Sequence, residues 1–263
     1  MTLHQDLVLR SDDTRGVCTL TLNRPESFNA LSQAMLSALQ SRLDGLKNES
    51  NLRVLVIAAK GKAFCAGHDL REMRAQPSHD YYQNLFNQCA NFMMSLQNLS
   101  VPVIAKIQGI ATAAGCQLVA QCDLAVASSD ARFAVSGVNL GLFCSTPSVA
   151  LSRNVSRKAA FEMLATGDFI DAQDALSKGL VNRVAEPGAI DQAVESLVSS
   201  ILKKPAIALA MGKALFYQQI ETSMSQAYEQ AAHTMACNMM DPSALEGVQA
   251  FIEKRPPNWS GSI

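Results

Sequence analysis

The residues from Gly109 to Asp123 combine small side chains with the start of an apolar, helix-forming segment. The sequence there is GIATAAGCQLVAQCD, and the strand-like run 103–107 leads directly into it. Small side chains at a strand-to-helix turn let another group approach the backbone closely. The first N–H groups of a helix have no partner within it, and the helix dipole gives this end a positive potential. The stretch could therefore hold an anion or an oxygen that becomes negative during a reaction, although its spacing also suits a tight packing turn.

A second loop of small residues precedes a potential helix start at Asp69. Its sequence is GKAFCAG at 61–67, His68 follows it, and the segment 69–74 could begin a helix. Asp69 is expected to stabilise the N-terminus of that helix, where negative charge is favourable. Glu72 is expected to be a solvated helix residue.

The cysteines and histidines of the chain predict neither disulfides nor a metal centre. The seven cysteines are scattered, mostly among apolar residues, and form no C-x-x-C pair. An odd number of scattered cysteines in apolar surroundings is typical of reduced, buried thiols in a reducing compartment. The four histidines form no H-x-x-H or H-x-x-x-H pair, which argues against a metal site.

Length, charge and hydropathy exclude several classes of protein. At 263 residues the chain is large for one domain and small for two. Lys and Arg total 22 against 23 Asp and Glu, and no long basic run occurs, so a nucleic-acid partner is not expected. No apolar run approaches about 18 residues, so no membrane-spanning helix is expected. The acidic N-terminal segment suits neither a signal peptide nor an organelle presequence, which predicts a cytoplasmic protein.

The elements that must position these loops alternate between strands and helices. Apolar and β-branched runs predict strands at 17–22, 53–59, 103–107 and 124–127, and helical spacing of apolar residues predicts helices at 31–46, 81–99, 156–166 and 171–177. This alternation predicts an α/β fold with helical crossovers. From about residue 187 the pattern is almost wholly helical, with Pro205 and Pro242 where helices could restart. A boundary near residue 200 is expected between an α/β core (1–200) and a helical tail (201–263).

Several segments together resemble the crotonase (enoyl-CoA hydratase/isomerase) superfamily over nearly the whole chain. They are LNRPESFNAL at 22–31, GKAFCAGHDL at 61–70, IQGIATAAGCQLVAQCDLAVAS at 107–128, VNLGL at 138–142, FIDAQDALSKGLVNRV at 169–184 and FIEKRPPNW at 251–259. The resemblance implies a spiral of repeated β-β-α units and a helical C-terminal region that packs homotrimers or hexamers. It also implies an acyl-CoA thioester as ligand, with coenzyme A as part of the substrate and no separate cofactor.

The resemblance assigns the two small-residue loops a shared task. In the family the thioester carbonyl lies between two backbone N–H groups, and the matching positions are His68 and Ala114. This agrees with the free N–H groups expected at the helix start after Gly109. Donors that are fixed before the reaction stabilise an oxygen that gains charge as an enolate forms. Losing one such donor typically costs about 3–4 kcal/mol.

Two positions depart from the hydratase pattern. Hydratases of the family use two glutamates, and the corresponding residues are Gln117 and Gly137. Neither residue can act as a general base, and general acid–base catalysis is typically worth about 10²–10⁴-fold. The hydratase activity, a carbon–oxygen lyase reaction, is therefore expected to be slow or to have been replaced by another reaction. Gln117 could still orient a water molecule by hydrogen bonding.

Two alternatives remain open beside an altered hydratase. The first is decarboxylation or another enolate-forming acyl-CoA reaction that needs no pair of glutamates. A methylmalonyl-CoA decarboxylase subgroup resembles the chain at AGHDL, VNLG and EKRPPN, and loss of CO₂ creates an enolate without a base. That subgroup has a tyrosine near Cys144 and an acidic residue at the position of Gln117. A non-catalytic acyl-CoA-binding or scaffold protein that keeps the fold is the other alternative.

Further residues are expected around the acyl-CoA. Cys144, Ser145 and Thr146 should border the pocket, where Cys144 is either a buried structural thiol or a group that contacts substrate. The His68 side chain is either a pocket wall or a proton-transfer group. Asp123 is expected to pin the loop before its strand. The resemblance places CoA contacts at Arg24, Ala66, Gly67, Asp69, Leu70, Phe251 and Lys254, with Lys254 and Arg255 as possible phosphate partners.

Overall fold

Two β-sheets form the body of the molecule, whose computed structural model describes residues 6–259. The larger sheet has the strand order β1-β2-β3-β5-β7-β10, and only its β1–β2 pair is antiparallel among the described strands. Its strands are β1 (Val8–Asp12), β2 (Val17–Leu22), β3 (Val54–Ala59), β5 (Val103–Ile107), β7 (Leu124–Ser128) and β10 (Arg183–Ala185). The smaller sheet consists of β4 (Ala63–Cys65), β6 (Ile110–Thr112), β8 (Arg132–Ala134) and β9 (Ile170–Asp171), in that order.

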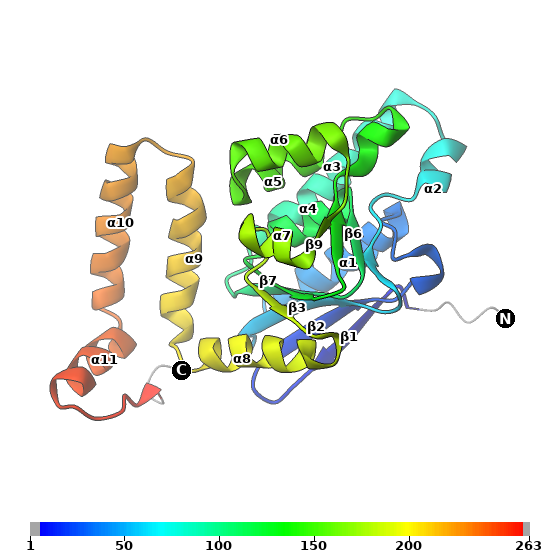
Figure 1. The fold of residues 1–263 in the computed structure, drawn as a ribbon. Coiled ribbons are helices and arrows are strands. Elements are labelled where there is room, and N and C mark those ends of the chain that lie inside the picture. Colours follow the sequence, from blue (N-terminus) through cyan, green and yellow to red (C-terminus); the bar gives the residue numbers. More distant parts are fainter. Residues whose placement is uncertain (1–5, 260–263) are drawn as a thin grey trace.

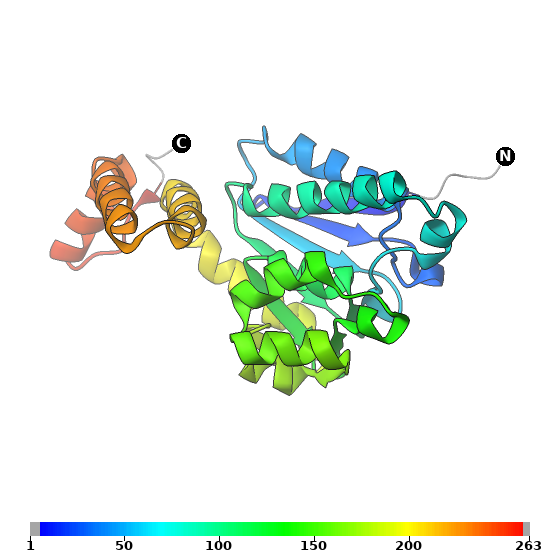
Figure 2. The same cartoon turned by 90° about the horizontal axis from the view of Figure 1, so that it is seen from above.

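Helices cover both faces of the larger sheet, which explains its continuous apolar strands. Leu55 and Ile57 of β3 pack in the main core with α1 (Gln33–Leu46) and α3 (His79–Gln97). The alternate residues, such as Val56, form a second cluster with α8 (Ile190–Leu202). Figure 2 shows α1 and α3 running along the same side of the sheet. A strand buried on both faces needs apolar residues at every position, not alternation.

A β-β-α unit repeats along the chain and produces a spiral. After a short link, β3 continues as β4, β5 as β6 and β7 as β8, and helices follow each pair (Figure 1). The expected crotonase-like α/β fold is confirmed. The remaining helices of the body are α2 (Leu70–Ala75), α4 (Ala114–Gln121), α5 (Ser145–Asn154), α6 (Arg157–Thr166) and α7 (Ala172–Ser177).

Local capping explains where several of these helices begin and end. Asp69 accepts hydrogen bonds from the N–H groups of Arg71 and Glu72, so it caps α2 as expected. Asp171 caps α7 in the same way. Gly167 adopts φ 67° directly after α6, a conformation that favours glycine and ends a helix.

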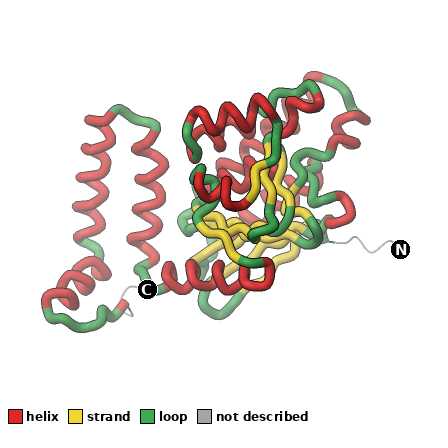
Figure 3. The backbone as a smooth tube through the Cα atoms, in the orientation of Figure 1, coloured by secondary structure: helices red, strands yellow, loops and turns green. Residues whose placement is uncertain are grey.

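Three helices follow the body. They are α9 (Ala206–Ile220), α10 (Met224–Met239) and α11 (Pro242–Ile252), and Figures 1 and 3 show α9 and α10 side by side. Pro205 directly precedes α9 and Pro242 is the first residue of α11, as the sequence predicts. The expected boundary at residue 200 falls in the last turn of α8, and a separate tail domain stays a prediction. Between residues 6 and 259, no helix is both long and apolar enough to cross a membrane.

A buried polar cluster anchors α9 to the body. The Lys213 ammonium donates to Asp123 Oδ2 at 2.7 Å, and the Tyr217 hydroxyl donates to Asp123 Oδ1 at 2.7 Å. The Val103 N–H also donates to Asp123 Oδ2, at 2.6 Å. Asp123 therefore connects the start of β5 to α9, a wider role than pinning its own loop.

Candidate functional site

An apolar pocket of about 410 Å³ opens where the two small-residue loops meet. Its lining comes from the loop before α2, from α2 and α3, from the start of α4, and from the segment that leads into α5. Within residues 6–259, the lining includes no Asp, Glu, Lys or Arg. The residues are Ala66, His68, Leu70, Met73, Phe86, Thr112, Ala113, Ala114, Ser136, Gly137, Leu140, Leu142, Phe143, Cys144, Ser145, Thr146 and Pro147.

The two loops touch through their backbones at Gly67. This glycine has φ +88°, and a methyl group on it would lie 2.9 Å from the Ala113 side chain and 3.2 Å from the Ala114 nitrogen. Both the conformation and the space require glycine. The residue that follows Gly67 is His68, so the two expected donor positions lie on main-chain segments in direct contact.

Hydrogen bonds from three directions fix the first of these loops. The Leu31 N–H donates to the Gly67 carbonyl at 2.7 Å, and the Ala66 N–H donates to the Phe28 carbonyl at 3.0 Å. The Thr112 hydroxyl of β6 donates to the Ala66 carbonyl at 3.0 Å. The loop is therefore held before any ligand arrives.

Two N–H groups at this contact have no acceptor. Ala114 is the first residue of α4, where a helix leaves its N–H groups free. In the part of the chain that the structure describes, neither the Ala114 N–H nor the His68 N–H donates a hydrogen bond. Ala113, directly before Ala114, has φ 49° and ψ −119°. A non-glycine residue in such a region costs about 1–3 kcal/mol, and such strain clusters at functional sites.

The His68 imidazole lies beside these donors with one ring nitrogen unused. Its Nδ1 is 3.2 Å from the Leu31 carbonyl oxygen, which can only accept, so Nδ1 carries the hydrogen. Its Nε2 is buried and has no partner among the described residues. The ring makes an edge-to-face contact with Phe86, with centroids 5.4 Å apart. Burial lowers the pKa of His68 below its usual 6.5 despite the Leu31 carbonyl, so the ring is neutral at pH 7.

The two positions that depart from the hydratase pattern differ in their surroundings. Gln117 is buried on α4, its Oε1 has no described partner, and it does not line the pocket. Gly137 lines the pocket, but a methyl group there would overlap the Leu142 carbonyl oxygen and lie 2.7 Å from Cys144 Sγ. The fold therefore leaves no room for a side chain at Gly137.

Cys144 fills the space that a residue at 137 would need. The Gly137 N–H donates to Cys144 Sγ at 3.3 Å, and the thiol is buried beside the pocket. Burial raises the pKa of Cys144, although the Gly137 N–H opposes this shift. The thiol stays protonated at neutral pH, which favours packing over nucleophilic chemistry. Ser145 and Thr146 border the pocket as expected.

The expected coenzyme A contacts are spread over two regions. Ala66, His68 and Leu70 line the pocket, whereas Gly67 is not among the lining residues. The Arg24 guanidinium donates to Asp69 at 2.9 Å, so these two residues form an ion pair next to the loop. Neither belongs to the pocket lining.

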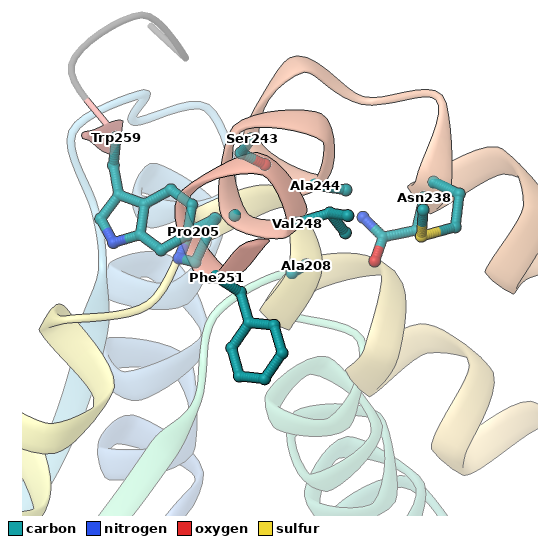
Figure 4. Close-up of a pocket in the computed structure, with 10 residues that line it drawn as sticks. Pro205, Ala208, Asn238, Ser243, Ala244, Val248, Phe251 and Trp259 are labelled. Atoms are coloured by element: carbon teal, nitrogen blue, oxygen red, sulfur yellow. The ribbon is translucent and has the colours of Figure 1, made fainter. Parts of the chain in front are cut away.

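The tail residues expected to contact coenzyme A lie elsewhere in the chain. Phe251 borders a hollow between α9 and α11, beside Pro205 and Val248 (Figure 4). Neither Phe251 nor Lys254 lines the pocket at Ala114, so the expected joint site is not formed within one chain.

Arg255 pairs with two carboxylates of its own chain. Its guanidinium binds Glu246 at 2.6 Å and Glu253 at 2.6 Å. A phosphate contact at Arg255 stays a prediction.

The structure also adds residues that the sequence reasoning missed. Glu72 accepts a hydrogen bond from the Gln33 N–H at 3.0 Å, so it links α2 to α1 and is not merely solvated. Met73 and Phe86 line the pocket. Phe86 belongs to the apolar pattern of its helix, and no local signal separates a pocket residue from a core residue there.

Comparison with known proteins decides the family. A family model described as enoyl-CoA hydratase/isomerase matches residues 12–262. The chain belongs to the enoyl-CoA hydratase/isomerase family. Among solved structures, it is similar to an enoyl-CoA hydratase from Mycobacterium smegmatis, at 64% identity and TM-score 0.96, over 97% of this chain and 100% of that one.

A second group of relatives of this family member shares one name. Human enoyl Coenzyme A hydratase domain-containing protein 3 is 41% identical in its crystal structure, with TM-score 0.92, over 96% of this chain and 100% of that one. The Xenopus laevis protein, named enoyl-CoA hydratase domain-containing protein 3, mitochondrial, is 45% identical over 94% of this chain and 84% of its own.

The names of these relatives contradict the cytoplasmic expectation. The proteins from Xenopus laevis, rat, mouse and human are all named mitochondrial. The expectation rested on the charge and hydropathy of the N-terminal segment alone. The relatives are similar to this chain in the folded body, which that segment does not describe. It is withdrawn.

Proposed function

We propose that the chain binds an acyl-CoA thioester and holds its carbonyl oxygen between the N–H groups of His68 and Ala114. The observation that carries this proposal is the pair of unpartnered donors on two main-chain segments that touch at Gly67. The pocket beside them is apolar and of a size that suits an acyl chain.

The donors would act on the charge that develops during the reaction. When a proton leaves C2 of a thioester, the electron pair moves toward the carbonyl and its oxygen becomes negative. Donors fixed by the fold stabilise this oxygen without reorganising, and each is typically worth about 3–4 kcal/mol. The position of Ala114 at the start of α4 adds the positive end of the helix dipole.

We do not expect hydration of a 2-enoyl thioester at the usual rate, because this reaction needs groups that move protons to and from water and C2. Gln117 and Gly137 supply no carboxylate to move protons, and Gly137 has no room for one. We expect hydration of crotonyl-CoA to be slower by about 10²–10⁴-fold than with a carboxylate base.

The pocket favours acyl groups without a free carboxylate. A methylmalonyl group would bring its carboxylate into a lining that includes no Lys or Arg within residues 6–259. An unpaired buried charge is costly, so the decarboxylase alternative is less well supported. The loss of both glutamates, at Gln117 and Gly137, also suits a non-catalytic binding role, and the experiment below distinguishes it.

Self-association is part of the proposal. Phe251 is 85% exposed and lies on a tail whose helices expose many large apolar side chains. These include Phe216, Ile220, Met224, Tyr228, Met235, Met240, Leu245 and Ile252. A homotrimer or hexamer would cover them and could bring Phe251 and Lys254 of one copy to the acyl-CoA of another.

A chromophoric thioester tests the carbonyl site directly. 4-(Dimethylamino)cinnamoyl-CoA absorbs at longer wavelength when its carbonyl is polarised, so binding should shift its absorbance to the red. The matching CoA thioether, which lacks the carbonyl, should bind more weakly. Binding of the thioester without a red shift would overturn the proposal.

Turnover is measured in parallel. The protein is incubated with crotonyl-CoA, a 3-enoyl-CoA and methylmalonyl-CoA, and products are followed by mass spectrometry. Rapid decarboxylation of methylmalonyl-CoA would favour the decarboxylase alternative. A red shift without turnover of any thioester would indicate a binding protein.

A further inference from the structure

We propose that the His68 side chain removes the C2 proton of the bound thioester, through Nε2. This inference rests on the proposed function and names the group that moves the proton in the absence of both glutamates. One residue would then supply an oxyanion donor from its main chain and the base from its side chain.

The composition of the pocket leaves few groups for this task. Among the described lining residues, His68 and Cys144 are the ones with a titratable imidazole or thiol. The Cys144 thiol accepts the Gly137 N–H, and burial raises its pKa. It therefore stays protonated, and His68 remains as the candidate base.

The tautomer of His68 is the one that a base requires. The Leu31 carbonyl accepts from Nδ1, which places the hydrogen there and leaves the lone pair on Nε2. Leaving a buried polar atom without a partner typically costs about 1–3 kcal/mol. Nε2 is such an atom, and a functional role is one explanation for it.

The charged groups near His68 are already engaged by other partners. Asp69, which caps α2, binds Arg24, and Glu72 of α2 accepts from the Gln33 N–H. On α3, the Tyr82 hydroxyl donates to the Met73 carbonyl. No described carboxylate bonds to the ring, so the bound enolate itself would be the counter-charge of the imidazolium.

The proton transfer needs no reactant other than the thioester and the His68 imidazole. The C2–H electron pair forms the C1–C2 double bond of the enolate, the carbonyl oxygen takes the negative charge, and Nε2 takes the proton. Return of the proton to C2 reverses the step. With a 3-enoyl thioester, return to C4 instead shifts the double bond to the 2-position. An enolate-forming proton transfer on a CoA thioester with an uncharged acyl group is thus the chemistry that this site would perform.

Deuterium exchange tests the base separately from the carbonyl site. Butyryl-CoA is incubated with the protein in D₂O, and deuterium at C2 is followed by mass spectrometry. The wild-type protein should catalyse exchange, and His68→Gln should lower the rate about 10²–10⁴-fold. The glutamine variant keeps the main-chain donor, so the red shift of the cinnamoyl probe should remain.

A matched control replaces an exposed histidine in the same way. His79 lies at the start of α3 with a side chain that is 89% exposed, so His79→Gln should leave exchange unchanged. The wild-type rate should rise with pH and level off once the imidazole has lost its proton. Burial lowers the pKa of His68, so the plateau should begin at a lower pH than for an exposed histidine. His68→Gln should lose this dependence.

Each other outcome overturns a specific part of the argument. A red shift without wild-type exchange, or unchanged exchange in His68→Gln, would overturn His68 as the base while the carbonyl site stands. Loss of the red shift in His68→Gln alone would assign its side chain to building the donor pair. Absence of the red shift in the wild-type protein would overturn the proposed function and this inference together.

Discussion

The two walls of the pocket are built in different ways. The donor wall, around Gly67 and Ala114, consists of main-chain segments in direct contact and held by main-chain hydrogen bonds. The facing wall, around Gly137 and Cys144, is filled by packed side chains and carries no described carboxylate. A donor pair made of backbone survives changes of side chain, whereas a base made of side chains is lost by single substitutions. The fold can thus keep enolate stabilisation while the proton-moving groups change.

The largest expected effect comes from placing a carboxylate on the facing wall. Gly137→Glu should lower the free energy of unfolding by about 3 kcal/mol or more, because the side chain overlaps Leu142 and Cys144 and buries a charge. Urea denaturation measures this loss. Gly188 has nothing within 4 Å of an added methyl group, so Gly188→Glu is the control and should change stability by less than about 0.5 kcal/mol. A stable Gly137→Glu protein with faster hydration would show that this wall has room for a base.

The donor wall should be almost as sensitive at its point of contact. Gly67→Ala should lower the free energy of unfolding by about 2 kcal/mol and abolish the red shift of the cinnamoyl probe. The added methyl group would push Ala113 and Ala114 away, and φ +88° is unfavourable for alanine.

Gly45, in the last turn of α1, provides the matched control for that variant. It also has nothing within 4 Å of an added methyl group, so Gly45→Ala should stabilise the protein by up to about 1 kcal/mol. A Gly67→Ala protein with normal stability and a normal red shift would mean that the two loops need not touch.

The fold was readable from the sequence wherever a segment was long and its pattern strong. The apolar run of β3 and the glycine after α6 are examples, since each is set by local chemistry. The strands β4 and β6 were missed because three residues carry no period, and pairing with distant strands makes them extended.

The candidate site also contains features that local sequence predicts and features that only the folded structure shows. The donor positions His68 and Ala114 follow from motifs, but the contact between them depends on packing across more than forty positions of the chain. The crowding of Gly137 by Cys144 and the engagement of Arg255 by Glu246 both depend on side chains brought together by the fold. No pattern within either segment indicates them.

A smaller effect is expected from a carboxylate behind the donor wall. Gln117→Glu should fold, because the two side chains are alike in shape, but burial should raise the pKa of the new carboxyl. The folded state then binds more protons than the unfolded state, so stability falls as pH rises above about 4.3. We expect a loss of about 1–2 kcal/mol at pH 8 that disappears near pH 4.

Denaturation across this pH range checks the sign of the effect. The exposed Gln83 on α3 is the control, and Gln83→Glu should show little dependence on pH. A Gln117→Glu protein that gains stability as pH rises would mean that unseen donors favour the charged carboxylate, and would make this position a usable base.

The smallest effect, and the one of opposite sign, is expected at Ala113. Its φ of 49° and ψ of −119° are strained for alanine, and such backbone strain typically costs about 1–3 kcal/mol. Ala113→Gly should relieve part of this strain energy. Glycine also loses more chain entropy on folding, which offsets about 0.4–1 kcal/mol of the gain. The net expectation is a stabilisation of up to about 1 kcal/mol with the red shift retained. Ala38→Gly, within α1, should instead lose about 1 kcal/mol. If Ala113→Gly loses as much as Ala38→Gly, the methyl contact with Gly67 outweighs the strain, and the donor wall depends on a side chain after all.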